Sequence, residues 1–100
     1  MSRYARKVDS NHRDIADMLK AIPGVNVLDT AAMSGLGCDL LVFYQERPAF
    51  LEIKSGAKKP LTDSERRLKK FAGAHWHRVE TFDDALRALG ISAERAPGEW

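Results

Sequence analysis

Hydrophobic residues occur along this chain in two patterns, helical spacing and continuous runs, and each pattern predicts one kind of element. In region 9–21 the apolar residues follow helical spacing, and Pro23-Gly24 supplies a stop signal. The residues of this stripe are Ile15, Met18, Leu19 and Ile22. We therefore expect a first helix over 9–21.

Continuous apolar runs predict strands at 39–44 and 49–54, joined by a four-residue turn at 45–48. Shorter runs predict further strands at 25–28 and 77–81. The two long runs are apolar at successive positions, which is typical of strands in the middle of a sheet with helices above and below. We expect these two strands to be central.

Two more helices complete the pattern. Thr62 begins one of them, with Glu65 three residues later in the capping-box arrangement, and Gly73 ends it. The amphipathic segment 82–89 predicts a short last helix, closed by Gly90. The expected order is α-β-β-β-α-β-α, which indicates an α/β fold with a mixed sheet flanked by helices.

The length of 100 residues and a hydrophobic content of 44% fit one compact domain, expected over 1–90, with a flexible tail at 91–100. No stretch approaches the roughly 18 apolar residues of a membrane span. The single cysteine excludes an internal disulfide. We expect a cytoplasmic protein with no membrane contact.

The net charge of +2 hides an uneven distribution. Residues 51–78 carry eight Lys or Arg against three Asp or Glu, a local excess of five, and residues 1–8 carry three bases and no acid. This clustering favours binding to a polyanion. The alternative is a solvated helix face that keeps the protein soluble.

Three charged residues, Asp39, Glu52 and Lys54, stand on the two long apolar strands. Burying an ionised group without a partner costs several kcal/mol, so something is expected to compensate these charges. If 45–48 forms the turn, Asp39 lies opposite Lys54. Glu52 then shares their face, diagonal to Asp39 at about 7–8 Å between Cα atoms.

Two carboxylates at that separation can bind one divalent cation. Mg²⁺ prefers oxygen ligands, is held by one or two carboxylates, and fills its other positions with water and substrate phosphate. An ammonium group near a scissile phosphodiester can stabilise the charge of the transition state. Asp39, Glu52 and Lys54 are therefore candidate catalytic residues for phosphodiester hydrolysis with Mg²⁺, or with Mn²⁺ in its place. The alternative is an ion-paired lysine in a structural hairpin.

An Asp followed one strand later by Glu-x-Lys, in this order of elements, resembles the PD-(D/E)XK nuclease superfamily over about residues 7–90. The opening Arg6-Lys7-Val8-Asp9-Ser10-Asn11-His12 and the Leu61-Thr62 start of the second helix are similar to small phage and prophage proteins of the VRR-NUC type. The resemblance implies a restriction-endonuclease-like core in a phage or its bacterial host.

The same resemblance implies a divalent-metal-dependent endonuclease. Asp39, Glu52 and the backbone carbonyl of Ile53 would be metal ligands, and Lys54 would be the catalytic lysine. Stand-alone members are often homodimers that cut branched DNA such as Holliday junctions, and relatives cut flaps. A branched DNA substrate and a homodimer are therefore expected.

The chain departs from the family pattern at two places. The proline expected before the motif aspartate is Cys38, and the first helix has no Glu to present to the metal. Winding the helix at 100° per residue puts Asn11 on its apolar stripe, so Asn11 is our candidate substitute, acting on the metal through water. Equally, Asn11 can serve as a helix-start residue that bonds backbone N–H groups.

Basic residues near the motif are candidates for contacts with the DNA backbone, which carry affinity without reading sequence. They are Lys58, Lys59, Arg66 and Arg67 near the second helix, with Arg6 and Lys7 at the start of the chain. Cys38 is interpreted as a small buried thiol and Trp76 as a core or dimer contact.

Two other functions remain open from the sequence. The missing helix-one Glu favours a catalytically inactive nucleic-acid-binding or assembly module that keeps the nuclease fold. A small structural domain with an accidental ion-pair cluster is the third interpretation.

Overall fold

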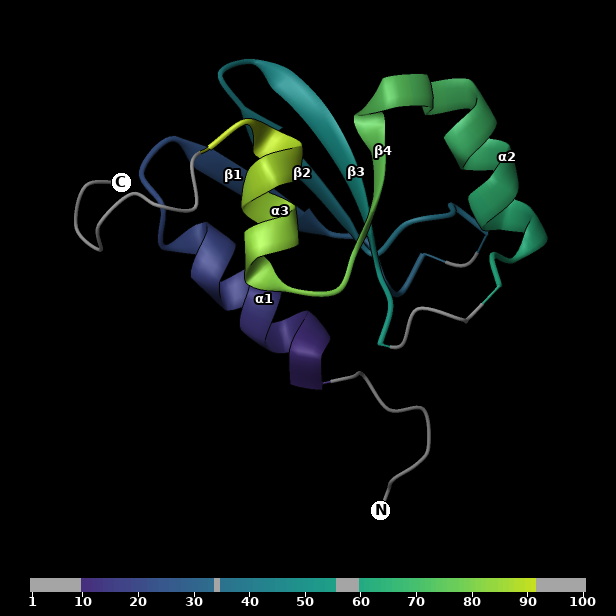
Figure 1. Ribbon diagram of the computed structural model, residues 1–100, viewed down its shortest axis with the longest axis horizontal. Helices are drawn as coiled ribbons and strands as arrows, with labels where there is room; N and C mark the ends of the chain where they lie inside the picture. The colour runs from purple at the N-terminus through teal and green to yellow at the C-terminus, as the bar shows by residue number, and fades with distance from the viewer. Residues whose placement is uncertain (1–9, 34, 56–59, 92–100) are drawn as a thin grey trace.

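The computed structural model describes residues 10–33, 35–55 and 60–91. The elements follow in the order α-β-β-β-α-β-α that the sequence predicts, with one turn of 3₁₀ helix, η1, before the last strand (Figure 1). They are α1 (Ser10–Lys20), β1 (Val25–Asp29), β2 (Leu40–Tyr44), β3 (Arg47–Ile53), α2 (Asp63–Ala72), η1 (Gly73–His75), β4 (Trp76–Val79) and α3 (Phe82–Leu89).

The four strands form one mixed sheet in the order β1-β2-β3-β4. β1 pairs with β2 and β2 pairs with β3 in antiparallel fashion, whereas β3 and β4 are parallel because α2 and η1 connect them. The two strands with continuous apolar runs, β2 and β3, are the central ones, as predicted.

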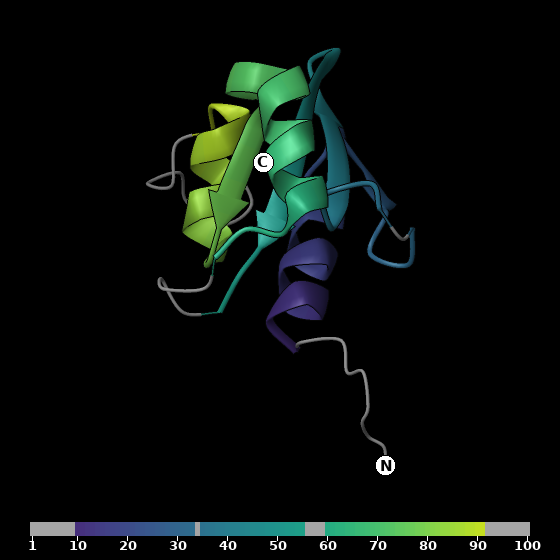
Figure 2. The same cartoon turned by 90° about the vertical axis from the view of Figure 1, so that its right-hand side faces the viewer.

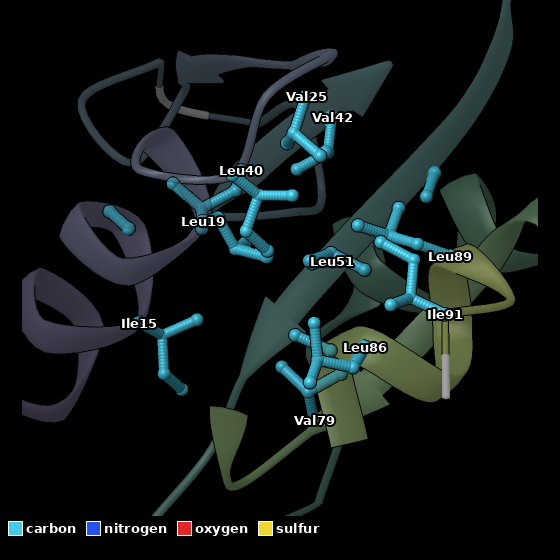
Figure 3. Close-up of a cluster of buried hydrophobic side chains, with 14 of the residues drawn as sticks. Ile15, Leu19, Val25, Leu40, Val42, Leu51, Val79, Leu86, Leu89 and Ile91 are labelled. Carbon is cyan, nitrogen blue, oxygen red and sulfur yellow. The ribbon is translucent and has the colours of Figure 1, made fainter. Parts of the chain in front are cut away.

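One face of the sheet carries the main hydrophobic core, under α1 and α3 (Figure 3). Alternate residues of the strands point into it, as the period of two requires. The largest fully buried side chains are Ile15, Leu19, Leu40, Leu51, Leu86, Val42 and Val79. Burying such side chains stabilises the fold by about 1.5–3 kcal/mol each. The packing on this face therefore fixes the position of the sheet.

The opposite face receives α2, and Figure 2 shows β4 between α3 and α2. The Trp76 indole Nε1 donates a 3.1 Å hydrogen bond to the Gly37 carbonyl, and Lys69 of α2 lies 5.6 Å above the Trp76 ring. Over β1 and β2 this face is open within the described residues, because Leu28 is 55% and Phe43 36% exposed. The predicted covering by helices therefore extends over only part of the second face.

The predicted turn at 45–48 is wrong. β2 and β3 are joined by the two residues Gln45 and Glu46, whose φ angles are 54° and 65°, the left-handed conformation that tight hairpins need. Tyr44 therefore pairs with Arg47, and the register is shifted by two residues from the predicted one. As a correction, Asp39 does not lie opposite Lys54: it directly precedes the Leu40–Leu51 pair and so is next to Glu52.

The caps of the later helices explain their boundaries. Thr62 and Glu65 form the predicted capping box at α2, and an analogous box of Thr81 and Asp84 begins α3. Ile91, which the sequence analysis assigned to the tail, is buried in the core, and residues 92–100 lie outside the described residues. None of the described helices is long and apolar enough to cross a membrane.

Candidate active site

Asp39 is fixed at the start of β2 by three hydrogen bonds to backbone groups. Its N–H donates to the Leu51 carbonyl at 2.9 Å, and its carbonyl accepts from the Thr30 N–H at 2.8 Å. Its carboxylate Oδ2 accepts the Ile53 N–H at 2.9 Å. Burial raises the pKa of Asp39, although the Ile53 N–H and the charge of His12 oppose this rise. The carboxylate is therefore aimed at the last residues of β3.

Glu52 lies on the α2 face of β3 and is only 5% exposed. Burial raises the pKa of Glu52 to about 8, with further contributions from the nearby charges of Asp39 and Glu65. A carboxyl group with this pKa keeps its proton at neutral pH when no cation is present. Ile53, the next residue, is buried at the end of β3 and directs its N–H to Asp39.

Lys54 brings its ammonium group between two glutamates. Nζ lies 3.4 Å from Glu52 Oε2, 3.0 Å from Glu65 Oε1 and 3.2 Å from Glu65 Oε2. Burial lowers the pKa of Lys54, but the bond to Glu65 and the charges of both glutamates outweigh it and raise the pKa above its ordinary value. Lys54 is therefore a firmly charged group held beside Glu52.

Glu65 is the residue of this cluster that sequence reasoning did not place in the site. Its only signal was the capping-box spacing with Thr62, which is a structural pattern. In the fold, β3 and α2 bring the Glu65 carboxylate within hydrogen-bond distance of Lys54. The two residues are 11 positions apart in the sequence, and no local sequence pattern predicts their contact.

The carboxylate residues Asp39, Glu52 and Glu65 line one cleft of about 180 Å³, and Lys54 lies beside it through its contacts with Glu52 and Glu65. The other lining residues are Ala31, Met33, Gly35, Gly37, Cys38, Thr62 and Ser64. Two larger hollows, of about 250 and 340 Å³, lie along β4 and α3 and contain none of these carboxylates or Lys54. The predicted convergence of Asp39, Glu52 and Lys54 on one face of the sheet thus agrees with the structure, with a different pairing partner for Asp39.

The donor set suits one divalent cation. Asp39, Glu52 and Glu65 carry three negative charges when all are ionised, and Lys54 carries one positive charge, so the net charge of the cluster is then −2. Within the described residues, no three His, Cys, Asp or Glu side chains form a preassembled metal cluster. Mg²⁺ does not need one, because one or two carboxylates with water and phosphate oxygens complete its coordination. Asp39 and Glu52, which both line the cleft, supply the two carboxylates that such a site requires.

Helix α1 brings two polar residues towards the sheet ends. Asn11 Nδ2 donates a 2.8 Å hydrogen bond to the Glu80 carbonyl, which ties α1 to the end of β4. The neighbouring His12 is buried, with Nε2 3.3 Å from Asp29 Oδ2, and it is close enough to Asp39 to influence the pKa of that carboxyl group. In the sequence, His12 is only part of the opening segment that resembles the VRR-NUC type, and no role is predicted for it.

The predicted DNA-binding residues are only partly described. Arg66 is exposed, but its guanidinium forms an ion pair with Asp63 and donates to the Leu61 carbonyl. Arg67 is exposed and donates to the Gly35 carbonyl at 3.1 Å. The other four, Arg6, Lys7, Lys58 and Lys59, lie outside the described residues.

Cys38 precedes Asp39 as the buried thiol that the sequence predicts. Burial raises the pKa of the Cys38 thiol and thereby favours its neutral form, although the contact with Thr30 Oγ1, 3.5 Å from Sγ, opposes this rise. Trp76 is buried against the 35–38 loop, in agreement with its interpretation as a core residue.

Comparison of the chain with protein-family models, with curated proteins and with solved structures finds no match.

Proposed function

We propose that this protein is a divalent-metal-dependent DNA endonuclease of the PD-(D/E)XK type, and that its sheet and helices form a restriction-endonuclease-like core. The observation that carries the proposal is the cleft that Asp39 and Glu52 share, with the charged Lys54 ammonium 3.4 Å from Glu52. The order of elements, α-β-β-β-α-β, supports the same assignment.

Asp39, Glu52 and the Ile53 carbonyl would hold Mg²⁺, or Mn²⁺ in its place. When bound, the ion supplies Lewis-acid activation of water and of the phosphate oxygens. The Ile53 N–H keeps the Asp39 carboxylate in one orientation through its 2.9 Å hydrogen bond, so this ligand is preorganised. When Glu52 gives up its proton to the metal, the excess of negative charge around the cleft favours a divalent ion over a monovalent one.

Lys54 contributes a positively charged hydrogen-bond donor, which the carboxylates lack. Its ammonium, held beside Glu52, would donate hydrogen bonds to the oxygens of the scissile phosphate, where negative charge grows in the transition state. Because Glu65 holds it through contacts of 3.0 and 3.2 Å, it needs little reorganisation when DNA arrives.

The substrate is proposed to be branched DNA, a junction or a flap, and the active form a homodimer. The excess of basic residues at 51–78 supports binding to a nucleic-acid backbone next to the cleft. On α2, Arg66 is neutralised by its ion pair with Asp63, whereas Arg67 bonds a backbone carbonyl. Arg67 is therefore the stronger of these two candidates for a phosphate contact.

A cleavage panel tests the proposal. The purified protein is incubated with linear, nicked, flapped and four-way DNA in Mg²⁺, Mn²⁺ or a chelator. We expect cleavage of a branched substrate with either metal and none with the chelator. Asp39→Asn keeps an oxygen for the Ile53 N–H but removes the charge, and it is expected to lower the rate at least about 100-fold.

Asp17→Asn on the exposed side of α1 is the matched control, since it makes the same chemical change outside the cleft. It should cleave at the rate of the parent protein. Equal rates for Asp39→Asn and the parent would refute the assignment.

An inactive nucleic-acid-binding or assembly module is the second candidate. It is favoured by α1, which brings His12 and no carboxylate of its own into the neighbourhood of Asp39. This function predicts retention on branched DNA at low salt without any metal-dependent product.

A further inference from the structure

Glu65 has an unusual environment for a capping residue. In a capping box the glutamate at the third helical position reaches back to the N-cap N–H, and Glu65 Oε1 does so by accepting the Thr62 N–H at 2.9 Å. Such a bond needs one oxygen and no net charge, since Gln serves as well as Glu. Glu65, however, is only 8% exposed, so the fold buries a carboxylate where a neutral amide would suffice for the cap.

The partner that compensates this charge is Lys54. Its ammonium is within hydrogen-bond distance of both Glu65 oxygens, at 3.0 and 3.2 Å, and it lies farther from Glu52, at 3.4 Å. The Lys54 and Glu65 side chains are both largely buried, so water is a poor substitute for either partner.

In the proposed function, the metal ion and the Lys54 ammonium compete for the Glu52 carboxylate. As a metal ligand, Glu52 would turn its oxygens to the cation, and Lys54 would lose one of its two carboxylate partners. A buried ammonium left without a partner is strongly disfavoured, so without Glu65 the lysine would hold Glu52 back from the metal or leave the cleft.

We propose that Glu65 is a positioning residue of the active site, which keeps the Lys54 ammonium beside the cleft and leaves Glu52 available to a divalent cation. The inference rests on the proposed function, and it assigns to the first turn of α2 a second duty besides the helix cap. The Lys54–Glu65 pair then stays in place whether or not the metal is bound.

Glu65→Gln separates the two duties, because Gln keeps the size and the capping bond but removes the charge. Asp84→Asn is the matched control, since Asp84 occupies the same position in the capping box of α3 and bonds the N–H groups of residues 80 and 81 and the side chain of Arg87. Each substitution replaces one capping carboxylate by its amide.

Two readouts do not require turnover. The first is the ¹H–¹⁵N signal of the Lys54 ammonium group, which is observable only when hydrogen bonds slow its proton exchange. We expect it in the parent and in Asp84→Asn, and we expect its loss in Glu65→Gln. The second is Mn²⁺ affinity by calorimetry, expected to fall on the order of 10-fold in Glu65→Gln alone, as for other groups that orient metal ligands.

With the branched substrate at saturating metal, Glu65→Gln should lower kcat at least about 10-fold with the KM for DNA unchanged. An unchanged Lys54 signal together with parental Mn²⁺ affinity in Glu65→Gln would overturn the inference and leave Glu65 as a helix cap. If the parent cleaves no DNA, the proposed function fails, and the ammonium signal and Mn²⁺ affinity still decide the role of Glu65.

Should Glu65→Gln fail to fold, Glu65→Asp replaces it. This variant keeps the charge and, as Asp84 in α3 shows, an aspartate can complete a capping box. The side chain is one methylene shorter and withdraws from Lys54, so the inference again expects loss of the ammonium signal, and its retention with parental Mn²⁺ affinity overturns the inference.

Discussion

Gly37 approaches helix α2 so closely that a Cβ atom on it would lie 2.5 Å from the Ser64 carbonyl oxygen. Its φ is +106°, a conformation that residues with a side chain rarely adopt, and its carbonyl accepts the Trp76 indole N–H. This contact holds the loop before Asp39 against α2, so the backbone at Gly37 links the position of Asp39 to the helix that carries Glu65.

Replacing Gly37 by alanine should therefore destabilise the protein by two effects, the positive φ and the clash with Ser64. We expect a loss of about 2–4 kcal/mol in the free energy of unfolding, measured by urea denaturation. Gly35→Ala is the matched control, because Gly35 also has a positive φ, +85°, but the methyl group of an alanine there would meet no atom of a non-neighbouring residue within 4 Å. It should lose only about 1 kcal/mol, and equal losses would show that the close approach does not matter.

The two-residue turn offers a stabilising substitution. Gln45 and Glu46 both have positive φ, where Asn and Gly are favoured. The double change Gln45→Asn and Glu46→Gly should raise the free energy of unfolding by roughly 0.5–1 kcal/mol in urea denaturation. Glu46→Ala removes the same charge without relieving the backbone, and it should bring no gain.

This turn also explains why Asp39 and Glu52 share one face of the sheet, as predicted, although the predicted register is wrong. Side chains alternate between the faces of a strand with a period of two, so a register shifted by two residues keeps every side chain on its face. Asp39 and Glu52 therefore share one face in the predicted register and in the observed one, although their pairing differs. A shift of one residue would have separated them.

The positions of Glu65 and His12 near the cleft depend on contacts between elements, which local sequence patterns do not predict. Glu65 reaches Lys54 only because α2 returns over β3, and His12 lies near Asp39 only because α1 packs at the end of β1. Spacing predicts which residues share an element and a face, whereas contacts between elements depend on how the helices cross the sheet. The carboxylates on neighbouring strands were accessible to sequence reasoning and these two residues were not.

The raised pKa of Glu52 predicts how stability varies with pH in a chelator. Between its ordinary value of 4.5 and about 8, the folded state holds a proton that the unfolded state has released, so stability falls as pH rises through this window. Glu52→Gln cannot ionise and lacks this fall. By urea denaturation it should be about 1–3 kcal/mol more stable than the parent at pH 9 and nearly equal to it at pH 4.

Asp17→Asn serves as the control for this comparison, since Asp17 is exposed on α1. Its stability relative to the parent should not change between pH 4 and pH 9. A constant difference for Glu52→Gln as well would mean that Glu52 carries its charge in the folded protein at neutral pH.

Metal binding should remove the proton from the Glu52 carboxyl group. A carboxyl group must lose its proton to bind a divalent cation, so below pH 8 each Mn²⁺ bound at this site releases about one proton. The apparent affinity should rise as pH increases from 6 to 8 and level off above. Calorimetry in two buffers of different ionisation enthalpy measures the released proton directly: about one at pH 6.5 and close to none at pH 9. An affinity that stays constant from pH 6 to 9, with no proton released, would contradict the binding of a protonated Glu52. If the Glu52→Gln comparison has also shown the raised pKa of Glu52, that result would exclude Glu52 as a ligand.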